Sequence, residues 1–146
     1  MIVCGLPGSG KTTLASSLEA RLEAVRMSPD DWMDALGISL HDESGRARIE
    51  ALQWNLAQRL LGLGQTVIIE WGTWARSERE VLRLGARALG AAVELHYVSA
   101  EPSVLVERIR ARAREHPPLS DDAIREWITR FEAPDETELL LYDSPL

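Results

Sequence analysis

Short apolar runs and longer amphipathic stretches alternate along this chain of 146 residues. The short runs favour strands, because they are apolar or rich in β-branched residues; they span residues 2–4, 25–28, 66–70, 92–98 and 139–142. The longer stretches place apolar residues at helical spacing, which predicts helices over 11–23, 43–63, 77–89, 102–115 and 121–131 and another beginning at Pro29. The alternation predicts an α/β fold with a mostly parallel sheet of about five strands.

Two local patterns support a helix-covered parallel sheet. Residues 66–70 read Thr-Val-Ile-Ile-Glu, and a strand this apolar is typical of a sheet that is covered on both faces. Ser28 is expected to cap the helix that begins at Pro29, since proline suits the first helical position and Asp30 and Asp31 suit the first turn. No internal repeat or long linker divides the sequence, so residues 1–146 are predicted to form a single domain.

Composition and charge narrow the functional classes. Hydrophobic residues make up 45% and charged residues 27%, which is ordinary for a globular protein. The formal net charge of −7 opposes broad binding to a nucleic-acid backbone. No apolar run reaches the ~18–20 residues that a membrane-spanning helix needs. The single cysteine, Cys4, requires no oxidising compartment, so we expect a cytoplasmic protein without a membrane partner.

Residues 5–12, Gly-Leu-Pro-Gly-Ser-Gly-Lys-Thr, match the phosphate-binding pattern G-x-x-x-x-G-K-[ST] between a predicted strand and a predicted helix. Glycines let successive backbone N–H groups face a phosphate, and the helix N-terminus adds its dipole. Lys11, the only lysine, is placed to reach the β- and γ-phosphates, and the Thr12 hydroxyl is placed to hold Mg²⁺. The residues of this segment that we expect to bind ATP are Gly8, Ser9, Gly10, Lys11, Thr12 and Thr13.

Two acids follow predicted strands and are expected near this loop. Asp30 follows the strand 25–28 and Glu70 closes the strand 66–70. Ligands of open parallel sheets bind at the carboxyl ends of the strands, so both acids should face one crevice. Asp30 could instead serve only the dipole of its own helix. Glu70 is expected either to hold Mg²⁺, through a water molecule, or to contact the substrate.

The chain resembles the small P-loop kinases that include chloramphenicol phosphotransferase, the zeta toxins and the kinase domain of phage polynucleotide kinase. The segments that carry the resemblance are Gly-Leu-Pro-Gly-Ser-Gly-Lys-Thr-Thr at 5–13, Ser-Pro-Asp-Asp at 28–31, Val-Ile-Ile-Glu at 67–70 and Glu-Arg-Ile-Arg-Ala-Arg at 107–112. The resemblance covers nearly the whole chain and implies a P-loop NTPase three-layer sandwich. It also implies that Asp30 accepts the proton of a substrate hydroxyl, and that Arg108 and Arg112, in an arginine-bearing lid over about 108–120, stabilise the transferring phosphoryl group.

Two departures from that family concern the phosphate acceptor. Polynucleotide kinases carry an arginine three residues after the proton-accepting aspartate, where this chain has Met33. Glu70 also replaces the aspartate that is typical of that kinase. With the net acidity, these differences argue against a nucleic-acid 5′-hydroxyl as the acceptor.

Aromatic and basic residues near the two acids are candidates for an acceptor site. Three tryptophans lie close to the acids in sequence: Trp32, Trp71 and Trp74. Aromatic walls suit apolar or ring-bearing ligands, and ordinary packing is the alternative explanation. Arg79 is expected either to meet an anionic substrate or to cap the edge of the sheet. Trp54 and Trp127, on amphipathic helices, are expected to be packing residues.

We therefore expect an ATP- and Mg²⁺-dependent kinase that transfers the γ-phosphoryl group to a hydroxyl of a small molecule, such as an antibiotic, a sugar nucleotide or a nucleoside. The expected catalytic residues are Lys11, Asp30 and Arg112, the expected metal ligands are Thr12 and Glu70, and the expected acceptor contacts are Asp30, Glu70, Trp71, Trp74 and Arg79. The alternatives are a polynucleotide 5′-hydroxyl kinase and a nucleotide-binding module that transfers nothing. The sequence leaves the oligomeric state open.

Overall fold

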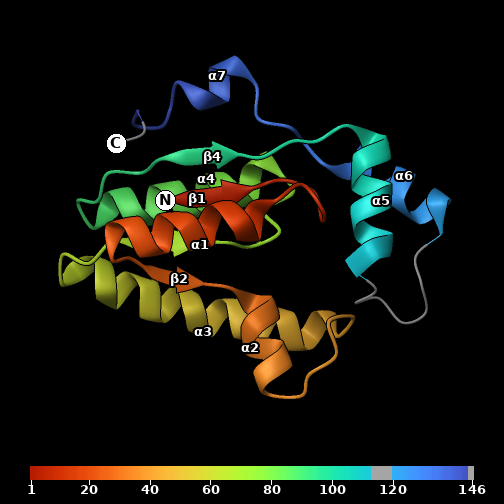
Figure 1. The fold of residues 1–146 in the computed structure, drawn as a ribbon. Helices are drawn as coiled ribbons and strands as arrows, with labels where there is room; N and C mark the ends of the chain where they lie inside the picture. The colour runs from red at the N-terminus through yellow and green to blue at the C-terminus, as the bar shows by residue number, and fades with distance from the viewer. Residues whose placement is uncertain (113–119, 145–146) are drawn as a thin grey trace.

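The computed structural model describes residues 1–112 and 120–144, with the backbone alone described for Arg112. At its centre is a four-stranded sheet in the order β2-β3-β1-β4, and Figure 1 shows β1 between β2 and β4. The strands are β1 (Ile2–Cys4), β2 (Val25–Met27), β3 (Val67–Ile69) and β4 (Leu95–Tyr97). Every strand pairing is parallel, and Ile2 is in register with both Ile69 and Leu95. The α/β class and the parallel sheet agree with the sequence-based prediction.

Helices cover both faces of this sheet (Figure 1). The described helices are α1 (Lys11–Leu22), α2 (Pro29–Ala35), α3 (Glu43–Gly62), α4 (Arg76–Ala88), α5 (Pro102–Arg112), α6 (Asp121–Arg130) and α7 (Glu136–Leu139). Helix α1 packs on one face, while α3 and α4 pack on the other, which gives the expected three layers. The remainder of the predicted helix 102–115 and most of the predicted lid at 108–120 lie outside the described residues.

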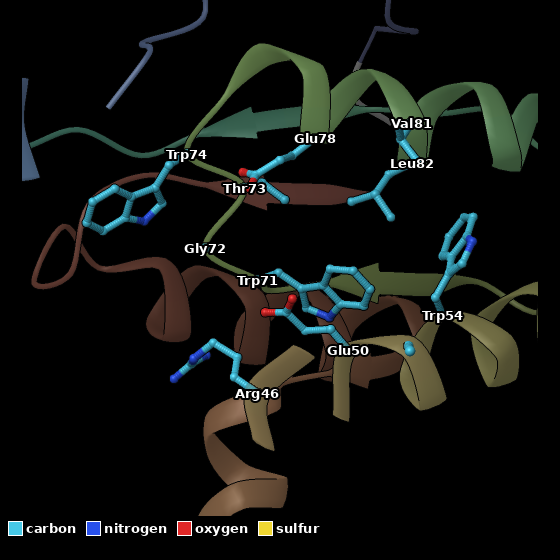
Figure 2. A pocket seen from close by; sticks show the side chains of 11 residues that line it. Arg46, Glu50, Trp54, Trp71, Gly72, Thr73, Trp74, Glu78, Val81 and Leu82 are labelled. Atoms are coloured by element: carbon cyan, nitrogen blue, oxygen red, sulfur yellow. The ribbon is translucent and has the colours of Figure 1, made fainter. Parts of the chain in front are cut away.

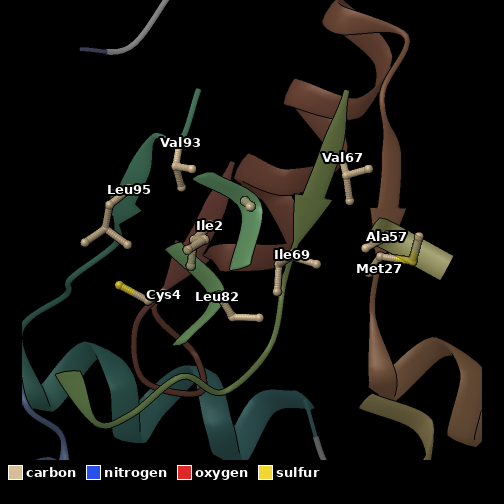
Figure 3. Close-up of a cluster of buried hydrophobic side chains, with 10 residues drawn as sticks. Ile2, Cys4, Met27, Ala57, Val67, Ile69, Leu82, Val93 and Leu95 are labelled. Carbon is tan, nitrogen blue, oxygen red and sulfur yellow. The ribbon is translucent and has the colours of Figure 1, made fainter. Parts of the chain in front are cut away.

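The two faces of the sheet follow from the alternation of side chains along each strand. Ile2 and Cys4 point to the face that α3 and α4 cover, where they pack with Ile69 and Leu82 (Figure 3). Val3, between them, points to the opposite face and packs against α1. Cys4 is fully buried, and this burial raises the pKa of its thiol to about 11. Cys4 is therefore a core residue.

Residues 139–142 do not form the fifth strand that their apolar sequence predicted. Helix α7 precedes this segment and ends at Leu139; Asp135 caps its start by accepting a hydrogen bond from the Glu138 backbone N–H at 2.7 Å. A turn follows α7, and Leu140 in that turn is 85% exposed. The apolar character of this segment therefore does not reflect a place in the sheet, which has four strands in the described part of the chain.

The start of α2 agrees with the predicted cap. Ser28 has an extended backbone, and its hydroxyl accepts a hydrogen bond from the Asp31 backbone N–H at 3.4 Å. Pro29 takes the first helical position, which places Asp30 in the first turn directly after β2. None of the helices in the described ranges is both long and apolar enough to cross a membrane.

Candidate active site

The loop between β1 and α1 has a backbone that only glycine adopts easily. Gly5, Gly8 and Gly10 have φ angles of 148°, 81° and 110°, in a region that side chains with a Cβ atom disfavour. A Cβ atom at Gly5 would also lie 2.2 Å from the Val98 carbonyl oxygen. The loop leads into the N-terminus of the 12-residue helix α1, whose free N–H groups and dipole attract anions. This arrangement is suited to holding phosphate.

Lys11 and Ser9 add polar groups to the phosphate loop. Lys11 Nζ donates a hydrogen bond across the loop to the Leu6 carbonyl at 3.1 Å. Ser9 is only 5% exposed, and its Oγ has no hydrogen-bond partner in the described structure. A buried hydroxyl without a partner is uncommon in folded proteins. A phosphate oxygen would satisfy it, so the residues of the loop fit a bound nucleotide.

A cavity of about 670 Å³ lies beside this loop and contains most of the residues expected to bind ATP. It is lined by Gly8, Ser9, Gly10, Thr12, Thr13, Leu14, Ser17, Val98 and Arg108. Arg108 reaches the loop from α5 and donates from Nη1 to the carbonyl oxygens of Gly8, at 3.3 Å, and Ser9, at 3.4 Å. The side chain of Arg112, one helical turn further on, lies outside the described residues, so its expected role stays a prediction.

Thr12 and Glu70, the expected metal ligands, are in direct contact. The Thr12 hydroxyl donates a hydrogen bond to Glu70 Oε1 at 2.5 Å. Hydroxyl and carboxylate oxygens suit Mg²⁺, which keeps several waters and needs few protein ligands. The described residues contain no group of three or more His, Cys, Asp or Glu side chains that could hold a metal by themselves. The pair therefore fits a Mg²⁺ ion that is shared with phosphate oxygens and water.

Arg26 on β2 fixes the position of Glu70 from the other side. Its Nη1 donates to Glu70 Oε2 at 2.6 Å, its Nη2 to Asp31 Oδ2 at 2.5 Å and its Nε to Glu19 Oε2 at 3.1 Å. Burial by itself would lower the pKa of Arg26, but the hydrogen bonds with these three carboxylates outweigh it and raise the pKa. The guanidinium therefore stays charged and leaves Glu70 Oε1 facing Thr12.

Asp30 shares a cavity with Lys11 of the phosphate loop. Arg46 of α3 donates from Nη2 to Asp30 Oδ1 at 2.7 Å, which orients the carboxylate. A cavity of about 410 Å³, which we call the acceptor cavity, has Asp30 in its wall. Its other lining residues include Lys11, Glu70, Trp71 and Trp74. The strand ends thus bring the lysine, both acids and two tryptophans to one cavity, as the topology led us to expect.

The tryptophans that line the cavities are not the set that the sequence led us to expect. Trp71 and Trp74 line the acceptor cavity, whereas Trp32 is not among its lining residues. Trp127 also lines it, with its ring edge-on to Trp74 at 5.7 Å between centroids, and Trp54 lines a neighbouring cavity. Trp54 packs against the buried core, as the sequence led us to expect, and both tryptophans also border cavities. Helical periodicity showed that they lie on a buried face but not that this face borders a cavity.

Arg79 is not available to a substrate, which corrects the expectation that it binds one. It is fully buried, and Nε and Nη2 donate to the two carboxylate oxygens of Glu138 at 2.7 and 2.8 Å. Its remaining hydrogen bonds go to the carbonyl oxygens of Thr73, Trp74 and Glu132. Burial alone would lower the pKa of Arg79, but the bonds to Glu138 raise it. Arg79 therefore anchors the loop before α4 to the segment that contains α7.

Sequence reasoning missed Arg26, Arg46 and Glu50 as residues of the site. Arg26 carried a signal, because an arginine in a strand of a helix-covered sheet needs a buried partner. Arg46 and Glu50 carried none, since both lie on a long amphipathic helix among other charged residues. Only the packing of α3 beside α2 brings them to the acceptor cavity.

Comparisons with known proteins agree with this geometry. The model of the AAA domain family AAA_33 matches residues 1–134. The chain belongs to this family. As a member, it has the kinase-like P-loop fold, which implies nucleotide binding. No curated protein matches the chain in sequence.

Several solved structures share the fold of this AAA domain. A kinase candidate from Chloroflexus aurantiacus is 26% identical, with a TM-score of 0.70, over 91% of this chain and 76% of that one. A gluconokinase from Sinorhizobium meliloti is 19% identical, with a TM-score of 0.62, over 92% and 75%. A chain of the Pnkp1/Rnl/Hen1 RNA repair complex is 24% identical, with a TM-score of 0.72, and this chain covers 88% of its own length but only 42% of that protein.

Proposed function

We propose that this AAA domain is a kinase that uses ATP and Mg²⁺ to phosphorylate a hydroxyl group of a small molecule. One observation carries the proposal: Lys11 of the phosphate loop, Asp30 and Glu70 line the same cavity of about 410 Å³. A nucleotide-binding site alone needs the loop and its lysine. It does not need a second carboxylate, held by an arginine, that lies outside the lining of the cavity beside the phosphate loop.

In the proposed reaction each residue of the site has its own role. The backbone of residues 8–13 and Arg108 bind the phosphates, and Lys11 neutralises charge that develops on the transferred group. Thr12 and Glu70 would hold Mg²⁺, which when bound supplies positive charge to the phosphate oxygens. Asp30 accepts the hydroxyl proton as the acceptor oxygen bonds to the γ-phosphorus and the bond to the β-phosphate oxygen breaks. Arg112 is proposed, from the family resemblance, to stabilise the transferring group.

Arg46 is proposed to orient Asp30 rather than to react. Its hydrogen bond occupies Oδ1 and leaves Oδ2 for the acceptor hydroxyl. We further propose that the enzyme acts in the cytoplasm, where ATP is supplied.

Transfer of labelled phosphate from ATP into a pool of small metabolites tests the proposal. We expect labelled product with the native protein and none with Asp30→Asn, while both bind ATP with equal affinity. Asp34→Asn, on the same short helix, is the matched control and should retain transfer. If Asp30→Asn transfers phosphate at the native rate, Asp30 is not the proton acceptor. If no acceptor is labelled at all, the protein is a nucleotide-binding module.

A polynucleotide 5′-hydroxyl is the second acceptor that we consider, because one structural neighbour belongs to an RNA repair complex. That likeness concerns the fold. Met33, at the position where polynucleotide kinases carry an arginine, is fully buried and offers no cation to a phosphate backbone. The net charge of −7 opposes the same acceptor. An oligonucleotide in the labelling assay distinguishes the two: we expect no transfer to it.

A further inference from the structure

A third cavity, of about 510 Å³, lies between α3, α4 and the loop that joins β3 to α4 (Figure 2). Its walls are mostly apolar and include three tryptophans, Trp54, Trp71 and Trp74, together with Val81 and Leu82 of α4. We call it the tryptophan cavity. Its volume is in the range of pockets that enclose small organic ligands, and aromatic walls of this kind favour a ring or another flat apolar group.

The tryptophan cavity adjoins the acceptor cavity. Both are lined by Arg46, Glu50, Trp71, Gly72 and Trp74, so the two cavities meet along these residues. Trp71 is held at this boundary because its Nε1 donates a hydrogen bond to Gln53 at 2.9 Å. A molecule that presents a hydroxyl to the carboxylate of α2 therefore has room to place the rest of its body among the tryptophans.

Thr73 shows that this wall is built for more than packing. It is 5% exposed, lines the tryptophan cavity and has a φ of 35°, which is a strained value for a β-branched residue. Its Oγ1 is buried and has no hydrogen-bond partner in the described structure. Strained backbone is concentrated at active and ligand sites, and a buried hydroxyl without a partner is uncommon. The hydroxyl is thus available to a polar group of a ligand.

The charges around the tryptophan cavity are mainly negative. Glu50 of α3 and Glu78 of α4 contribute carboxylates from its two helical walls (Figure 2). The cation in the lining, Arg46, is already paired with Asp30. Burial raises the pKa of Glu50, Arg46 opposes the shift, and the charges of Glu78 and Asp30 add to it. A positively charged ligand group near Glu50 would offset both the cost of burying its carboxylate and the repulsion from Glu78 and Asp30.

We propose that the acceptor of this kinase is an alcohol that carries an apolar ring and a basic amino group. The ring lies among Trp54, Trp71 and Trp74, the ammonium group lies near Glu50 and Glu78, and the hydroxyl reaches Asp30. The same two carboxylates should disfavour sugar acids and other anionic acceptors. This inference rests on the proposed kinase function, and it adds the chemical class of the acceptor.

Binding to matched alcohols, followed by the fluorescence of the cavity tryptophans and by calorimetry, tests the inference without requiring turnover. Phenylalaninol carries the ring, the ammonium group and the hydroxyl; phenylpropanol lacks the charge, phenyllactate carries a carboxylate, and ethanolamine lacks the ring. The amino alcohol, neutral alcohol and hydroxy acid classes are each extended with compounds that carry larger or smaller rings. We expect the best ring-bearing amino alcohol to bind at least tenfold more tightly than its neutral, anionic and ringless counterparts. Equal binding of the neutral or anionic counterparts, or no binding in the amino alcohol class, overturns the inference.

Charge removal then locates the site. Glu50→Gln combined with Glu78→Gln should reduce the preference for the ammonium compound over its neutral counterpart to less than threefold. Glutamine at 78 still provides the oxygen that accepts from the Ala75 backbone N–H, so α4 keeps its N-terminal hydrogen bond. Glu80→Gln, on the same helix but not in the cavity wall, is the matched control and should leave the preference unchanged. A preference that survives the double substitution places the ligand elsewhere and refutes the assignment.

Failure of this inference differs from failure of the kinase proposal. If ATP phosphorylates neutral or anionic alcohols but not amino alcohols, the kinase function stands and the acceptor class is wrong. If amino alcohols bind with the expected preference but no phosphate is transferred to any of them, the binding site stands and the kinase function fails.

Discussion

Replacement of Arg79 by methionine should cost much of the stability of this domain. The change leaves Glu138, whose side chain is 3% exposed, without its cation. It also removes the donors to three backbone carbonyls, of Thr73, Trp74 and Glu132. Breaking a buried ion pair by removing one partner costs about 3–5 kcal/mol. That is a large part of the ~5–15 kcal/mol by which a typical domain is stable.

Urea unfolding followed by circular dichroism measures this loss. With a slope of about 2 kcal/mol per molar urea, the midpoint of Arg79→Met should fall by about 2 M. Arg76→Met is the matched control on the same helix: the side chain is 45% exposed and its ion pair with Asp135 spans 3.8 Å, so its unfolding free energy should change by less than about 1 kcal/mol.

A double-mutant cycle separates the ion pair from the carbonyl contacts. Glu138→Gln alone should cost about 2 kcal/mol, because the amide oxygen keeps one acceptor for Arg79. The double variant Arg79→Met, Glu138→Gln should be more stable than the sum of the two losses predicts, since it buries no unpaired charge. A loss below about 1 kcal/mol for Arg79→Met, or strictly additive losses, would refute the structural role. A stable Arg79→Met protein with weakened acceptor binding would restore the sequence-based expectation.

Three further predictions concern the phosphate loop, the metal pair and the core. Lys11→Ala should weaken ATP binding by about 10- to 100-fold with an unchanged circular dichroism spectrum, because it removes one charge-assisted contact; calorimetry measures this, and unchanged affinity contradicts the assignment. Arg26→Met should lower the unfolding free energy by about 2 kcal/mol. Added Mg²⁺ should raise the melting temperature of this variant more than that of the native protein, because the ion replaces the lost cation at Glu70. If Mg²⁺ raises both melting temperatures equally, Glu70 is not a metal ligand. The Cys4 thiol, with its pKa raised by burial to about 11, should be only about 0.1% ionised at pH 8, so it should react with a thiol reagent far more slowly in the folded protein than in urea; equal rates would mean that the core opens freely.

Much of the fold and the phosphate loop was determined by the sequence. Gly5, Gly8 and Gly10 have positive φ angles, which disfavour any residue with a Cβ atom. At Gly5 an added Cβ atom would also lie 2.2 Å from a carbonyl oxygen. The apolar strand 67–69 requires cover on both faces, so helices on either side of a parallel sheet follow from it. These features depend on local backbone conformation and on the spacing of apolar residues, and both can be read from a short stretch of sequence.

The tertiary structure alone decided which charged residues meet. Arg46 is separated from Asp30 by 16 residues and Arg79 from Glu138 by 59, and nothing in their local sequence distinguishes them from exposed arginines. The same holds for residues 139–142, whose apolar side chains suggested a strand until the cap at Asp135 began a helix before them. Long side chains reach partners that the packing of helices brings near, so the residues around Asp30 come together only in the folded chain, whereas the phosphate-loop pattern lies in a single short segment.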